Sequence, residues 1–110
     1  MSEHYITFSF EVLVENIKEF LTLTKDLKQG SIIKMRQIIL DIESKLNDIL
    51  NISDSDYINK NSKIEYADEA RNKIENVFNG RLKTQQTVEF YYKAISITGQ
   101  YQDIVKTIYN

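Results

Sequence analysis

Apolar residues recur every three or four positions through most of the chain, which is the periodicity of an amphipathic α-helix. A first series follows Ser9, a candidate N-cap, with the spacing 3, 4, 3, 4, 3. Its members are Phe10, Leu13, Ile17, Phe20, Thr24 and Leu27. A second series repeats this spacing and is entirely apolar, with the members Ile32, Met35, Ile39, Ile42, Leu46 and Ile49. Both series predict helices that pack along one seam.

The two series are out of phase, because Leu27 and Ile32 are five positions apart, one more than the repeat allows. One extra residue turns the seam by about 100° on an ideal helix. The slip falls at Gly30, so one long helix kinks there or the chain breaks into two helices with Ser31 as a new N-cap. The pattern is compatible with both.

Residues 52–61 interrupt the helical pattern near the middle of the chain. This segment is rich in Asn, Asp and Ser, whose side chains bond to nearby backbone groups and favour turns. Beyond it, Ser62 and Glu65 have the spacing of a capping box, which predicts the start of another helix. The chain is therefore expected to be one domain with a first arm over residues 10–50 and a second arm over residues 62–109.

The second arm keeps the 3-4 spacing along its whole length. Its members are Ala67, Ala70, Ile74, Val77, Arg81, Thr84, Val88, Tyr91, Ile95, Thr98, Gln102, Val105 and Tyr109. Asn79 and Gly80 form a turn-like pair within this arm. The unbroken phase nevertheless favours a helix that continues through Gly80, with a weak point of about 1 kcal/mol.

These patterns predict an all-α fold in which two long arms form an antiparallel helical hairpin, with Tyr57 and Asn59 in the turn. The first arm would be about 60 Å long and the second about 65 Å. The alternative is an up-down bundle of four shorter helices, which break at Gly30, near Tyr57 and at Gly80.

The apolar rows are wider than a single neighbouring helix can cover, which predicts an interface with a helical protein partner or a second copy of the chain. The predicted interface residues are Ile33, Ile38, Leu40, Phe78, Leu82, Tyr91, Tyr92, Tyr101, Ile104 and Tyr109. Tyrosine suits such an interface because its ring is apolar and its hydroxyl can meet a polar group. The four-helix alternative would bury these side chains internally and would need no partner.

Composition excludes most kinds of site chemistry. The chain has no Cys and a single His, His4, so thiolate and histidine-based zinc sites and a Ser-His-Asp group are not expected. The 14 Lys and Arg against 16 Asp and Glu leave a net charge of −2, without the basic excess of a nucleic-acid-binding domain. We therefore expect no enzyme activity, no cofactor, no metal and no nucleic-acid partner.

Two stretches carry a resemblance to a known family, namely ITFSFEVL at residues 6–13 and QGSIIKMRQIILD at residues 29–41. They resemble the opening and the first helix of the small WxG-type helical-hairpin proteins of type VII (ESX-like) secretion. The resemblance implies a non-enzymatic adaptor that binds the helical N-terminal domain of an LXG-like toxin and helps to target it for export.

The chain departs from that family at two motifs. It has no Trp, so the Trp-x-Gly turn is absent, and Tyr57-Ile58-Asn59 would be a degenerate counterpart. The C-terminal Tyr-x-x-x-Asp/Glu export signal is also missing, because Val105 follows Tyr101 at the fourth position.

Two other functions remain open on the residues alone. One is a four-helix immunity-type protein that protects its producer from a bacteriocin or toxin, and the other is a small phage-encoded inhibitor of a host protein. Residues 1–10 lack the pattern of a Sec-type signal peptide, and no apolar run is long enough to span a membrane. We expect synthesis in the cytoplasm, with export lacking a cleavable signal in the adaptor role.

Overall fold

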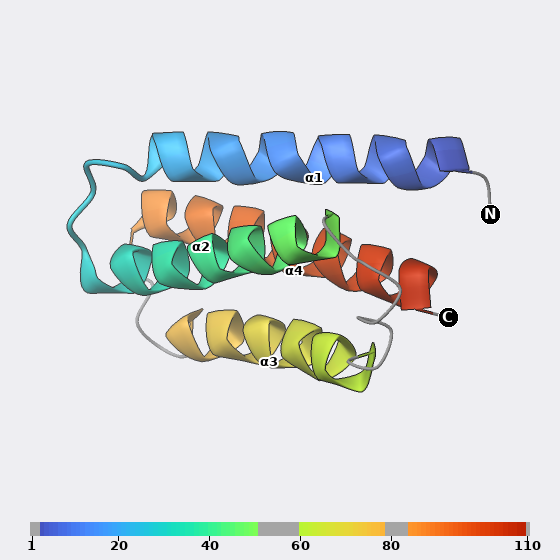
Figure 1. Cartoon of the computed structure of the whole chain (residues 1–110). Helices are drawn as coiled ribbons and strands as arrows, with labels where there is room; N and C mark the ends of the chain where they lie inside the picture. Colours follow the sequence, from blue (N-terminus) through green and yellow to red (C-terminus); the bar gives the residue numbers. More distant parts are fainter. Residues whose placement is uncertain (1–2, 51–59, 79–83, 110) are drawn as a thin grey trace.

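The computed structural model describes residues 3–50, 60–78 and 84–109. These residues form four α-helices, named α1 (Glu3–Leu23), α2 (Gly30–Leu50), α3 (Lys60–Phe78) and α4 (Gln85–Tyr109). Figure 1 shows that each helix runs antiparallel to the one before it. Helices α2 and α4 pack against each other in the middle, and α1 and α3 lie on opposite sides of this pair. The arrangement is an up-down four-helix bundle.

The prediction of an all-α fold is confirmed, and the architecture adopted is the four-helix alternative. The two predicted arms are not continuous, since α1 ends at Leu23, α2 begins at Gly30, and α3 packs against α4 as a separate helix. The longest dimension of the bundle is 44 Å, shorter than the arm of about 60 Å expected for a hairpin. Because the chain folds back at these points, each helix packs against at least two other helices, which cover its wide apolar face. The predicted turn residues Tyr57 and Asn59 lie outside the described residues.

The end of α1 is fixed by a contact with α2. The buried Thr24 hydroxyl donates a hydrogen bond of 2.6 Å to the Phe20 carbonyl and accepts one of 2.9 Å from Arg36 Nη1. Arg36 also donates to the Leu21 carbonyl. A guanidinium at this end of a helix neutralises the partial negative charge of the unpaired carbonyls. Arg36 therefore stabilises the end of α1 and holds α2 beside it.

The starts of α2 and α4 meet through side-chain hydrogen bonds. Thr84 caps α4, because its hydroxyl accepts the Thr87 N–H at 3.2 Å. The Thr87 hydroxyl donates to Gln29 Oε1 at 3.0 Å, just before α2. The Gln29 carbonyl accepts the Ile33 N–H at 2.9 Å, so Gln29 occupies the N-cap position of α2. The predicted N-caps Ser9 and Ser31 both lie inside helices, because α1 already begins at Glu3, before the predicted start at residue 10, and α2 begins at Gly30.

The core of α1, α2 and α3 follows the predicted rows closely. The buried members of these rows are Leu13, Ile17, Phe20 and Thr24, then Ile32, Met35, Ile39, Ile42, Leu46 and Ile49, and finally Ala67, Ala70 and Ile74. All six predicted positions of α2 are buried. The 3-4 spacing alone therefore located the inner face of these three helices.

The core row of α4 lies one residue earlier than predicted. Its buried members are Thr87, Phe90, Ala94, Ile97, Tyr101 and Ile104. In the predicted row, Thr98 and Val105 are also buried, whereas Val88, Tyr91 and Ile95 are half-buried. Helix α4 contacts all three other helices, so its apolar face must be wide and both rows are apolar. The buried row of α4 does not continue the 3-4 spacing of the buried row of α3, as expected for two separate helices.

We predict that Ile97→Ala destabilises the fold more than Ile95→Ala. Ile97 is only 1% exposed, so its truncation should lower the free energy of unfolding by about 3 kcal/mol. Ile95 is half-buried on the flank of the core and should cost about 1 kcal/mol. Urea denaturation followed by circular dichroism measures both values. A larger loss for Ile95→Ala would mean that the predicted row, and not the observed one, faces the core.

Candidate partner-binding surfaces

Several large apolar side chains stay exposed after the core has closed. Within the described residues they are Phe8, Leu23, Ile33, Leu40, Phe78 and Tyr92. Four of them, Ile33, Leu40, Phe78 and Tyr92, belong to the predicted interface. Ile38 and Tyr91 of that interface are half-buried.

Two predicted interface residues require correction. Tyr101 is 0% exposed and Ile104 is buried beside it in the core row of α4. The bundle covers them because α4 packs against three helices, whereas a two-helix hairpin would have left them open. Leu82 lies outside the described residues, as does the side chain of Tyr109.

Three aromatic rings gather where α3 ends and α4 begins, and we call Phe78, Tyr91 and Tyr92 the aromatic cluster. The Phe78 and Tyr91 rings are stacked, with centroids 4.2 Å apart, and the Tyr92 ring meets Tyr91 edge-on at 5.3 Å. Tyr92 is 63% exposed and Phe78 is 39% exposed. Burial raises the pKa of Tyr91, and the nearby Glu75 carboxylate raises it further. The cluster combines a fixed apolar surface with hydroxyls at its edge, as protein interfaces favour.

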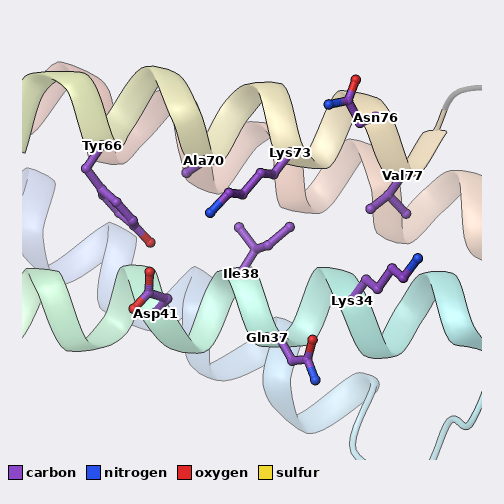
Figure 2. A pocket seen from close by; sticks show the side chains of 9 residues that line it. All are labelled: Lys34, Gln37, Ile38, Asp41, Tyr66, Ala70, Lys73, Asn76 and Val77. Atoms are coloured by element: carbon purple, nitrogen blue, oxygen red, sulfur yellow. The ribbon is translucent and has the colours of Figure 1, made fainter.

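An open groove of about 620 Å³, the α2–α3 groove, runs between these two helices. It is lined by Lys34, Gln37, Ile38 and Asp41 of α2 and by Tyr66, Ala70, Lys73, Asn76 and Val77 of α3. Figure 2 shows Ile38 between the two helices and the Lys34 and Lys73 side chains extending into the space beside it. The groove therefore offers apolar contacts together with two ammonium groups.

One end of this groove is closed by a tyrosine–aspartate pair. Tyr66 points across to α2 and donates a hydrogen bond to the Asp41 carboxylate. The Tyr66 ring meets the Tyr101 ring edge-on, with centroids 5.9 Å apart, and Lys45 Nζ lies 5.3 Å from the Tyr66 centroid. Burial is the main cause that raises the pKa of Tyr66 well above its ordinary value, followed by the hydrogen bond to Asp41. This end of the groove is thus fixed and already paired.

A smaller pocket of about 200 Å³ lies between α1 and α4, at the opposite end of the bundle from the aromatic cluster. Phe8, Val12 and Ile104 give it an apolar lining, and Asp103 and Gln100 contribute polar atoms. Phe8 is 64% exposed at its mouth. This pocket is too small for a helix, so the aromatic cluster and the α2–α3 groove are the better candidates for protein binding.

The described residues hold no cluster of side chains suited to binding a metal ion. Among residues 3–50, 60–78 and 84–109, no three His, Cys, Asp or Glu side chains come together as metal ligands would. None of the described helices has the length and apolar character needed to cross a bilayer. The two ion pairs found among these residues, Arg71–Glu75 and Lys93–Glu19, are both exposed.

The sequence pattern predicted Ile38 as an interface residue, but it did not indicate the polar and charged residues that line the α2–α3 groove with it. Lys34, Ile38 and Asp41 share one flank of α2, and Tyr66 and Lys73 share one flank of α3. A signal for them existed, because each flank adjoins a correctly predicted core row. Combining the two flanks, however, required knowing that α2 and α3 are neighbours. Comparison with models of protein families, with curated proteins and with solved structures finds no match to the chain.

We predict that Tyr66→Phe makes the stability of the fold less sensitive to alkaline pH. The folded state holds the Tyr66 proton more tightly than the unfolded state, so the free energy of unfolding should fall as pH rises above about 10. Tyr66→Phe should lose about 1 kcal/mol at neutral pH, because the hydrogen bond is lost, but should show a shallower alkaline decline. Urea titrations between about pH 8 and pH 11 measure the slope. Tyr92→Phe is the control, because its ring is exposed. If the stability of Tyr66→Phe declined with pH as steeply as that of the wild type, the folded state would not be holding the Tyr66 proton more tightly.

Proposed function

We propose that this protein is a non-enzymatic binding protein that holds a helical segment of another protein. The observation that carries this proposal is the aromatic cluster, in which Phe78 and Tyr92 stay exposed and pack on Tyr91 after the core has closed. Burying rings that are already fixed costs little conformational entropy, so such side chains contribute strongly to protein interfaces. The α2–α3 groove adds a second surface of the kind into which helices dock.

The resemblance of residues 6–13 and 29–41 to WxG-type proteins indicates which partner to test first. In this proposal, the partner is the helical N-terminal domain of an LXG-like toxin, and the bound protein helps to target that toxin to a type VII secretion machine. In this role the protein is made in the cytoplasm and exported without a cleavable signal peptide. The four-helix bundle differs from the hairpin of that family, so the exposed surfaces carry the proposal and the family architecture does not.

An immunity-type role is the second candidate, and a specific observation favours it. The bundle buries its own core row in every helix, as a protein that acts as a monomer requires. An immunity protein would bind the toxic domain and protect the producing cell, whereas an adaptor would bind the helical N-terminal domain. Binding assays with the two separate domains of a toxin encoded beside this chain distinguish these roles.

We predict that Tyr92→Ala weakens binding of the partner domain by about tenfold or more, as expected for an interface anchor. Because Tyr92 is 63% exposed, the free energy of unfolding should change by less than about 0.5 kcal/mol. Phe8→Ala is the matched control, since Phe8 is 64% exposed at the other end of the bundle. Isothermal titration calorimetry measures the affinities.

Equal affinities for wild type and Tyr92→Ala would remove the aromatic cluster from the interface. Failure of the wild-type protein to bind either toxin domain, together with no protection of sensitive cells, would contradict both proposed roles.

A further inference from the structure

The α2–α3 groove has an uneven distribution of charge. Lys34 and Lys73 extend into it from opposite helices, and both are exposed. The one acidic side chain in its lining, Asp41, accepts the hydrogen bond of Tyr66. Figure 2 shows Lys73 extending toward this end of the groove and Lys34 extending away from it. The ion pairs found among the described residues involve other lysines and arginines. The lining therefore carries two ammonium groups against one carboxylate, an excess of one positive charge, although the chain has a net charge of −2.

The apolar part of the groove lies next to these lysines. Ile38 projects from α2 between the helices, and Val77 lines the α3 side near Lys34. Ala70 also lines the groove but is only 1% exposed, so Ile38 and Val77 provide its accessible apolar surface. The α3 wall from Tyr66 to Val77 spans about 16 Å, which is three helical turns. A segment of three turns with one apolar stripe would match this length.

We infer that the α2–α3 groove binds an acidic amphipathic helix, with apolar side chains over Ile38 and Val77 and with Asp or Glu carboxylates beside Lys34 and Lys73. The charge complementarity selects an acidic partner over a basic one, because a basic helix would bring like charges against both ammonium groups. This inference rests on the proposed function, since it specifies the chemistry of the helical partner. It concerns a different face of α3 from the aromatic cluster, which lies against α4.

The test uses two synthetic helical peptides with the same stripe of Leu residues. One peptide carries Glu beside the stripe and its twin carries Lys at the same positions. The acidic peptide should bind the wild-type protein at least about tenfold more tightly than the basic twin, and added salt should weaken its binding. Fluorescence anisotropy measures the affinities, and amide chemical shifts should move at residues 34–41 and 66–77.

Charge reversal at the two lysines provides the matched variants. Lys34→Glu combined with Lys73→Glu should lower the affinity for the acidic peptide by about tenfold or more. The control is Lys18→Glu combined with Lys25→Glu, which makes the same change of net charge at exposed positions outside the groove. This control should weaken binding of the acidic peptide by less than about threefold. Lys34→Gln combined with Lys73→Gln removes the charge without reversing it and should give an intermediate loss. Circular dichroism melting checks that each variant is folded.

Equal binding of the two peptides, equal effects of the two charge-reversed pairs, or chemical shifts confined to the aromatic cluster would each overturn the inference. A toxin domain whose binding requires Tyr92 but tolerates reversal of Lys34 and Lys73 would also overturn it, while leaving the proposed function standing. If the acidic peptide bound in the groove but neither toxin domain bound the protein, the inference about the groove would be supported and the proposed function would be wrong.

Discussion

The packing of α2 against α4 between α1 and α3 is the constraint on which the rest of the structure depends. Each of these two central helices has three neighbours, so α4 needs an apolar face wider than a single seam. It meets this need with a buried row through Phe90, Ala94, Ile97 and Tyr101 and a half-buried flank at Tyr91. The same wide face brings Tyr91 and Tyr92 to the surface beside Phe78. The aromatic cluster is thus a continuation of the core.

The rows of α1, α2 and α3 could be predicted from the sequence because each has one apolar stripe with a clear phase. In α4 the two adjacent rows are both apolar, so the pattern could not distinguish Ile97 from Ile95 as the inner residue. The phase slip at Gly30 left a kink and a break between α1 and α2 both open. The pattern could not show the contact of Arg36 with Thr24, twelve positions apart, that stabilises the end of α1. The Lys34 and Lys73 pair could not be predicted at all, because its meaning depends on α2 and α3 being neighbours.

The aromatic cluster and the α2–α3 groove are two surfaces of the bundle with different kinds of side chain. The described residues supply aromatic rings, exposed aliphatic side chains and two lysines that face a groove. Side chains of these kinds contribute to protein interfaces through burial, stacking and charge. The paired Tyr66 and Asp41 fix one end of the groove, while Lys34 and Lys73 extend into the space beside Ile38. The structure therefore joins a closed core to two distinct surfaces, and their separation lets mutagenesis test each one alone.

The most direct test of this account is a distance between spin labels on α1 and α2. The chain has no Cys, so Glu15→Cys and Ser44→Cys, both at exposed positions, place one label on each helix. Because packed helix axes lie about 8–10 Å apart, pulsed electron paramagnetic resonance should give a label separation of about 20 Å. A first arm that continued as one helix would place the labels about 44 Å apart. A distribution centred on that longer distance would contradict the four-helix bundle and the surfaces derived from it.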